Sequence, residues 1–109
     1  MTVPDFPFQT FDWTSIPEEH HKGETGYAVW QIINVGSIRV RRVVYSPNYK
    51  ADHWCSKGHV IQCLEGSMIT ELHDGRQMPL EKGMTYIVGD GNEAHRTQSS
   101  TGCTLFIVD

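Results

Sequence analysis

Short segments rich in β-branched and aromatic residues recur along the chain, and they constrain its fold more than any other feature. Turn-forming residues separate these segments, which cover residues 27–35, 38–45, 60–64, 68–72, 77–80, 85–88 and 104–108. From residue 27 onward, no stretch keeps an apolar period of 3.6 residues over three helical turns. Strands at intervals of about 8–12 residues are typical of sandwiches and barrels. The sequence therefore predicts an all-β fold.

The turn signals also divide the chain. Asp74-Gly75 predicts a β-hairpin with a type I′ turn, because glycine tolerates the positive φ that this turn requires.

The first 26 residues contain prolines that interrupt any helix, at Pro4, Pro7 and Pro17. We expect residues 1–26 to form an irregular N-terminal extension that packs on the body of the protein or on a dimer partner. Residues 27–109 are expected to form a single domain.

Charge and cysteine content narrow the classes of function. The formal net charge is -4, without the basic surplus of a nucleic-acid-binding domain. The first residues show no basic segment followed by an apolar one, as a secretory signal would. No apolar run reaches the roughly 20 residues of a membrane span. Three cysteines without a C-x-x-C pair favour reduced thiols. We expect a cytoplasmic protein that binds neither nucleic acid nor membranes.

Histidine and cysteine residues gather in one short segment and recur further on. The segment holds His53, Cys55 and His59, and His95 follows a glycine-rich turn. Residues two apart in a strand project from the same face, so His53 and Cys55 can point together. His59 can turn back toward them after Gly58, and a strand that pairs across a closed barrel would bring His95 alongside. Imidazole and thiolate groups suit zinc, iron, nickel or copper far better than magnesium or calcium.

The spacing of these residues resembles that of the two cupin motifs. The first motif is matched by His53-x-Cys55-x3-His59-x6-Gly66, and the second, with one more residue before the histidine, by Gly83-x5-Gly89-x-Gly91-x3-His95. The stretch 51–59 also looks like the signature of the small bacterial cupins named for a DHCW motif, although its order is Asp-His-Trp-Cys. The resemblance implies a double-stranded β-helix (jelly-roll) barrel, a metal held by His53, Cys55, His59 and His95, and a homodimer.

The departures from the cupin pattern bear on the choice of metal. Cys55 stands where the family has its second histidine, and His59 stands where it has a glutamate. Three histidines and a thiolate bring one anionic ligand, as three histidines and a glutamate do. The softer donor set favours zinc or iron, with nickel or copper as further candidates. Cys55 is a metal ligand, a reactive thiol beside the metal, or a packing residue.

Other polar residues have plainer interpretations. Asp52 either orients a ligating imidazole or belongs to a strand-end turn. Of the arginines, Arg39 and Arg41 share one strand face and Arg42 takes the other, and whichever lines the barrel could clamp an anionic ligand. The remaining histidines, His20, His21 and His73, are expected to be solvated or satisfied side chains. Buried hydrophobic roles are expected for Cys63 and Cys103, and core or pocket-wall roles for Trp30, Trp54, Tyr86 and Phe106.

Two classes of function follow from this site. The first is a metal-dependent enzyme, dioxygenase-like or isomerase-like, that acts on a small molecule held in the barrel, as the cupin resemblance implies. The second is a small-molecule-binding or sensor domain in which four protein ligands close the shell of a structural metal. A cupin barrel hosts many activities, so the resemblance supplies no particular reaction.

Overall fold

The computed structural model of the chain describes residues 6–109, which form an antiparallel β structure with one short 3₁₀ turn. The elements in chain order are η1 (Trp13–Ser15), β1 (Glu19–Lys22), β2 (Tyr27–Val35), β3 (Ile38–Tyr45), β4 (Tyr49–Lys50), β5 (His59–Leu72), β6 (Gln77–Glu81), β7 (Thr85–Val88), β8 (His95–Ser99) and β9 (Cys103–Val108). The all-β prediction is confirmed. Over these residues, no helix is long and apolar enough to cross a membrane.

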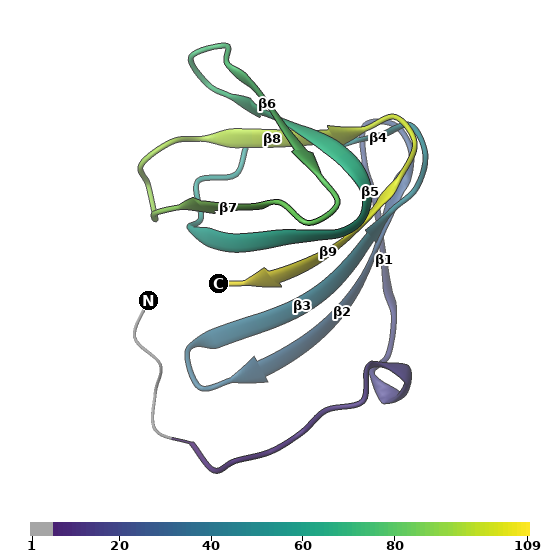
Figure 1. Cartoon of the computed structure of the whole chain (residues 1–109), viewed down its shortest axis with the longest axis vertical. Coiled ribbons are helices and arrows are strands. Elements are labelled where there is room, and N and C mark those ends of the chain that lie inside the picture. Colours follow the sequence, from purple (N-terminus) through teal and green to yellow (C-terminus); the bar gives the residue numbers. More distant parts are fainter. Residues whose placement is uncertain (1–5) are drawn as a thin grey trace.

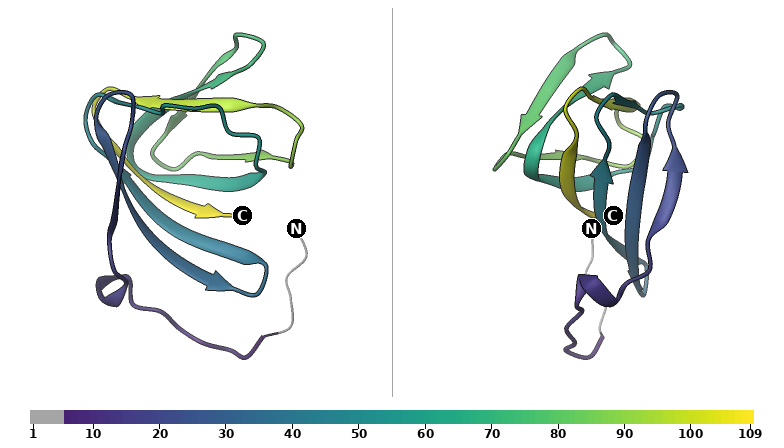
Figure 2. Two further views of the ribbon diagram at one scale, coloured as in Figure 1. Left: turned by 180° about the vertical axis from the view of Figure 1, so that it is seen from behind. Right: turned by 90° about the vertical axis from the view of Figure 1, so that its right-hand side faces the viewer.

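The strands form one sheet that curls into two layers. Its order is β1-β2-β3-β9-β5-β8-β4, and β6 and β7 also pair with β5. In Figures 1 and 2, β6, β8 and β4 lie above, and β7, β9, β3 and β2 fan out below. Because β5 is long, its first half pairs with β7 and β9 and its second half pairs with β6 and β8. This strand therefore joins the two layers.

A glycine sets the bend within β5. The register with β9 shifts between Cys63 and Glu65, and Gly66 follows with a φ of 76°. A Cβ atom on Gly66 would lie 2.3 Å from the carbonyl oxygen of Gly102. An L side chain would meet both an unfavourable φ and a backbone atom at this position, so glycine is required here.

Alternate residues of both layers form the core. Its buried members are Ala28, Val43, Ile61, Cys63, Met68, Leu80, Cys103, Leu105 and Ile107. The prediction that Cys63 and Cys103 are small buried residues is confirmed. Trp30 and Tyr86 pack against this core as expected. Trp54, in contrast, is 38% exposed and lies beneath the guanidinium group of Arg96.

The expected strands match the observed ones where apolar residues alternate. The bounds of β2, β3 and β7 agree with the prediction, whereas the segments 60–64 and 68–72 turn out to be one strand, β5. The sequence did not predict β1, β4 or β8. In β8 the buried residues are polar, namely His95, Thr97 and Ser99, so this strand carries no apolar alternation. Strand formation there depends on its pairing with β5.

The hairpin predicted at Asp74-Gly75 forms between β5 and β6, but its turn differs from the predicted type I′. Gly75 has a φ of 96°, while Asp74 is not among the described residues with positive φ. The amide of Gly75 donates to the carbonyl oxygen of Leu72 at 2.9 Å. This is the pattern of a type I turn followed by a glycine bulge, which needs one positive φ instead of two.

Of the predicted irregular extension, residues 1–26, residues 1–5 lie outside the described part of the chain, and residues 12–22 contain regular elements. Strand β1 pairs with β2, and the side chain of Asp12 accepts a hydrogen bond from the amide of Thr14 at the start of η1. The Gln31 side chain of β2 donates to the carbonyl oxygens of Trp13 and Ile16 at 2.7 and 2.9 Å. These bonds hold the 3₁₀ turn against the sheet.

Candidate metal centre

One cysteine and two histidines meet at one end of the barrel. Cys55, His59 and His95 each present a donor atom, and the three atoms lie within 4.8 Å of one another. Both histidines are buried, and Cys55 is partly buried. Cys55 Sγ lies 3.5 Å from His59 Nε2, and the two imidazole rings meet edge to face with 5.1 Å between centroids. One thiolate and two imidazoles form a donor set that can hold a transition metal.

Backbone pairing brings these residues together from distant parts of the chain. Cys55 and His95 exchange both backbone hydrogen bonds, at 2.8 and 2.9 Å, in an isolated antiparallel bridge. His59 is the first residue of β5 and pairs with Val88, the last residue of β7. Backbone pairing therefore holds the three donors in place. It also brings His95, which is distant in sequence, next to Cys55.

Hydrogen bonds orient both histidine rings toward the group. His59 Nδ1 lies 2.8 Å from Asp109 Oδ2, and His95 Nδ1 lies 2.9 Å from the carbonyl oxygen of Glu93. A carboxylate and a carbonyl oxygen only accept, so each Nδ1 donates, and in the neutral ring this leaves the lone pair on Nε2. Burial lowers the pKa of His95, which favours the neutral ring that a metal requires. Such outer partners are typical of histidines that ligate metals.

The carboxylate of Asp109 is completely buried between two arginines and the imidazole ring of His59. It receives hydrogen bonds from Arg39 at 2.9 and 3.2 Å, from Arg41 at 3.0 Å and from His59. Burial alone would raise the pKa of Asp109. The hydrogen bonds from His59 and Arg39, together with the charges of Arg41 and Arg39, lower it far below its ordinary range. Asp109 is therefore ionised and holds the His59 ring in one orientation.

The arginines of β3 have the predicted alternation. Arg39 and Arg41 lie on the inner face and bind a carboxylate, but that carboxylate belongs to Asp109 of the same chain. The Arg41 side chain also stacks over Trp30, with its guanidinium carbon 4.7 Å from the ring centroid. The two arginines that were expected to bind an external anion thus bind the Asp109 carboxylate instead.

His53 lies apart from the three donors. Its side chain is 76% exposed, and its Nδ1 lies 2.6 Å from Asp52 Oδ1. The expectation that His53 and Cys55 share a face assumed an extended strand, whereas residues 52 and 53 form a bend. A bend breaks the period of two, so the two side chains diverge. Ligation by His53 stays a prediction.

Asp109 was not foreseen as a site residue, although the sequence held a signal for it. The alternation of Cys103, Leu105 and Ile107 on the inner face of β9 continues to position 109. A charged residue at an inward position needs a partner, because an unpaired buried charge is costly. The alternation of inward-facing residues therefore predicts that the Asp109 carboxylate lies in the interior. Which residues pair with it depends on the order of strands in the sheet.

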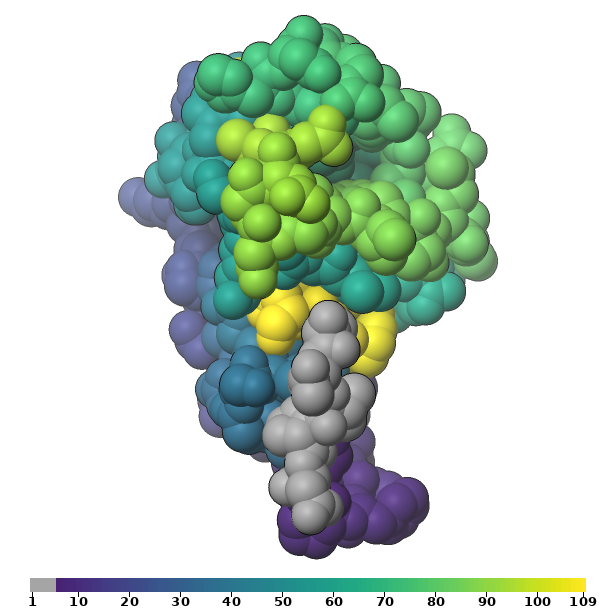
Figure 3. Space-filling model, turned by 90° about the vertical axis from the view of Figure 1, so that its left-hand side faces the viewer, coloured from purple at the N-terminus to yellow at the C-terminus, as the bar shows by residue number. Residues whose placement is uncertain are grey.

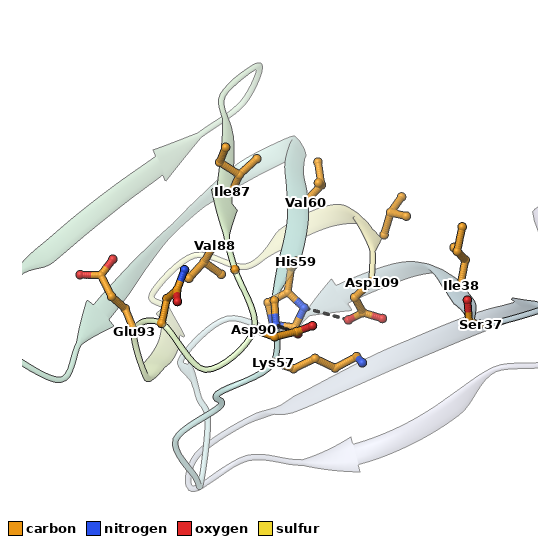
Figure 4. A pocket seen from close by; sticks show the side chains of 14 residues that line it. Ser37, Ile38, Lys57, His59, Val60, Ile87, Val88, Asp90, Glu93 and Asp109 are labelled. Carbon is orange, nitrogen blue, oxygen red and sulfur yellow. Dashed lines mark hydrogen bonds and ion pairs between the residues drawn. The ribbon is translucent and has the colours of Figure 1, made fainter. Parts of the chain in front are cut away.

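An open hollow of about 650 Å³ gives access to this end of the barrel. Its walls include His59, Asp109, Lys57, the β2–β3 hairpin at Ser37 and the loop at Asp90. Figure 3 faces this end, where the last residues of the chain (yellow) are visible between green and teal residues above and blue residues below. Figure 4 shows the His59 ring directed at Asp109, with the Lys57 side chain beside them. His59 and Asp109 line this hollow, whereas Cys55 and His95 do not.

Comparisons with known proteins identify the fold. The chain matches no protein-family model and no curated protein. Among solved structures, a predicted oxalate decarboxylase of Thermotoga maritima matches with a TM-score of 0.78 and 14% identity, over 92% of this chain and 96% of that one. The polyketide cyclase RemF of Streptomyces resistomycificus matches with a TM-score of 0.77 and 21% identity, over 94% of this chain and 78% of that one.

A third match names a superfamily. A sugar phosphate isomerase of the cupin superfamily from Silicibacter pomeroyi has a TM-score of 0.70 and 16% identity, over 92% of this chain and 74% of that one. The jelly-roll fold expected from the two motifs is confirmed, and assignment to the DHCW group stays a prediction. The chain has the fold of the cupin superfamily, with Cys55, His59 and His95 gathered at one end of its barrel.

Proposed function

We propose that this protein binds a transition metal through Cys55, His59 and His95 and acts on a small molecule that enters by the hollow beside His59. The observation that carries the proposal is the orientation of the two rings, since each Nδ1 is held by an acceptor while His59 Nε2 faces the Cys55 sulfur at 3.5 Å. His95 Nε2 is buried and has no hydrogen-bond partner among residues 6–109. A buried nitrogen lone pair without a donor fits a metal.

The donor set favours zinc or iron. One thiolate and two imidazoles are soft to intermediate ligands, which disfavours magnesium and calcium. Three protein ligands leave room in the coordination shell for a substrate, and a bound metal would supply a Lewis acid or a redox centre. An isomerase and a cyclase among the structural neighbours support an enzymatic role, although the shared fold alone does not select a reaction.

The alternative is a binding or sensor protein with a structural metal. The observation that favours it is the place of His53, two residues before Cys55 on an exposed bend. If His53 turned toward the group, four protein ligands would close a tetrahedral shell. The two functions therefore differ in whether His53 binds the metal.

The test is metal analysis of protein purified without a metal-affinity tag, followed by reconstitution with zinc or iron(II). We expect one equivalent of metal in the wild type and a loss of at least tenfold in affinity in Cys55→Ser, His59→Gln and His95→Gln. His20→Gln is the matched control, because His20 is an exposed histidine on β1. Wild-type affinity in all three variants would contradict the proposal.

His53→Gln separates the two functions. Unchanged affinity would leave three protein ligands and an open shell, as an enzyme requires. A tenfold or greater loss would place His53 on the metal and favour the structural role. X-ray absorption on the zinc-loaded protein gives the number of sulfur and nitrogen ligands independently.

A further inference from the structure

Two segments of backbone carry the three donors, and they lie against each other over several residues. The connection between β4 and β5 carries Cys55 and leads into His59, and the loop between β7 and β8 leads into His95. Backbone bonds join the segments at Cys55 and His95, and the amide of Gly91 donates to the carbonyl oxygen of Ser56 at 2.8 Å. These bonds use main-chain atoms, so they place few demands on residue type.

A side chain makes a further connection between the two segments. The Asp90 side chain accepts a hydrogen bond from the amide of Gly58 at 2.6 Å, and Gly58 directly precedes His59. The backbones approach closely here, since a Cβ atom on Gly58 would lie 2.7 Å from the Asp90 nitrogen. Asp90 and His59 both line the hollow (Figure 4). The residue at position 90 can therefore affect the backbone from which the His59 ring projects.

We propose that Asp90 is a positioning residue of the metal group, which acts through the amide of Gly58 on the backbone that carries His59. The inference rests on the proposed function, because it concerns how the same donors are held. A site whose donors are already in place loses less conformational freedom when it binds a metal. Asp109 orients the His59 ring, whereas Asp90 fixes the main chain just before it.

The experiment titrates the full chain with cobalt(II), whose visible absorption reports on the geometry of its ligands. Asp90→Ala removes the acceptor of the Gly58 amide. Because this bond is exposed, water can replace the lost acceptor, so we expect the variant to fold. It should bind cobalt about fivefold or more weakly than the wild type, since the metal must then order the segment before His59. The visible bands should change as well.

Asp90→Asn distinguishes the hydrogen bond from the charge. Its side-chain oxygen still accepts from Gly58 and an exposed charge contributes little, so cobalt affinity should stay within about twofold of the wild type, with the same spectrum. The matched control is Asp74→Ala. Asp74 is also an exposed aspartate that accepts from a backbone amide, that of Arg76 at 3.1 Å, and its loss should leave affinity and spectrum unchanged.

Gly58→Ala tests the same contact without removing the carboxylate. The added Cβ would meet the Asp90 nitrogen at 2.7 Å, so the segment and the loop must move apart. We expect weaker cobalt binding and changed bands in this variant too. Urea denaturation of every variant without metal shows which of them fold, so that cobalt binding is compared only among folded proteins.

The outcomes separate the two proposals. If the wild type binds cobalt and either folded variant, Asp90→Ala or Gly58→Ala, binds it equally well with the same spectrum, the positioning role is refuted and the metal site stands. If Asp90→Asn loses as much affinity as Asp90→Ala, the hydrogen bond is not what acts, and the role is refuted as well. If the wild type binds no cobalt, the proposed function fails and the positioning role fails with it. Weaker binding in Asp90→Ala and Gly58→Ala, with Asp90→Asn and Asp74→Ala unchanged, supports the role.

Discussion

At the scale of single residues, Asp109 links the charge balance of the interior to the orientation of His59. Its carboxylate is completely buried and accepts hydrogen bonds from two arginines and one imidazole. Burying such a set of charges is favourable only when every member stays paired. Removing the negative charge would leave Arg41 and its neighbour Arg39 without compensation at the inner end of β3.

We predict that Asp109→Asn lowers the free energy of unfolding by about 3 kcal/mol, because it leaves a buried cation without its counter-charge. It should also lower metal affinity about tenfold or more, since the partner that orients His59 loses its charge. Urea denaturation and metal titration measure the two effects. Asp74→Asn serves as the control, because Asp74 pairs with Arg76 at an exposed turn and its loss should barely move the denaturation midpoint.

At the scale of elements, the shape of the barrel depends on how β5 bends. The two halves of this strand pair with different neighbours, and the change of direction falls at a register shift followed by Gly66. The bend places His59, at the start of β5, and Thr70, near its end, on the inner faces of opposite layers. The candidate site thus depends on a backbone conformation that lies outside it.

We predict that Gly66→Ala destabilises the protein by about 3 kcal/mol or more, because it adds a close contact with Gly102 to the strain of a positive φ. The control is Gly83→Ala. Gly83 also has a positive φ, of 89°, but no described atom lies within 4 Å of a Cβ placed there. That variant should lose only about 1–2 kcal/mol, the cost of the left-handed conformation. Equal losses in the two variants would show that the contact with Gly102 is relieved by movement of the backbone.

At the scale of the whole molecule, the core keeps several weakly acidic groups protonated. Burial raises the pKa of Cys103 from 9.0 to about 12. Burial also raises the pKa values of Tyr45 and Tyr86. These groups remain neutral in the folded protein at pH values where the unfolded chain has released their protons.

We predict that the protein loses stability as the pH rises from about 9 toward 12. In this range the folded state binds more protons than the unfolded state, so the free energy of unfolding decreases with increasing pH, whereas below about 9 these groups contribute their full stabilisation. Urea denaturation at a series of pH values measures the slope. Cys103→Ala should show a shallower slope over the same range, and an unchanged slope in that variant would rule out this role for Cys103.

The homodimer and the cytoplasmic location expected from the sequence stay predictions at this scale. Among the described residues, Phe8 is 96% exposed and Ile87 on the outer face of β7 is 77% exposed.

The amino-acid pattern was enough to predict the all-β class, the hairpin at Asp74-Gly75 and the grouping of Cys55, His59 and His95. Alternating side chains produce strands wherever one face is apolar, and this local rule located β2, β3 and β7. The spacing of Cys55 and His59, followed by a distant His95, indicated a metal group because these residue types have few other reasons to gather. Each of these inferences needed only neighbouring residues or their chemical type.

The other features of the site depend on contacts between distant parts of the chain. Strand β8 was missed because its buried residues are polar, and they are stabilised by partners that are distant in sequence. The His53 side chain lies apart from Cys55, because the bend at residues 52 and 53 breaks the alternation of an extended strand. Asp109 reaches His59 through the pairing of β9 with β5 in the sheet. Sheet order depends on contacts between residues far apart along the chain, which no local pattern of the sequence encodes.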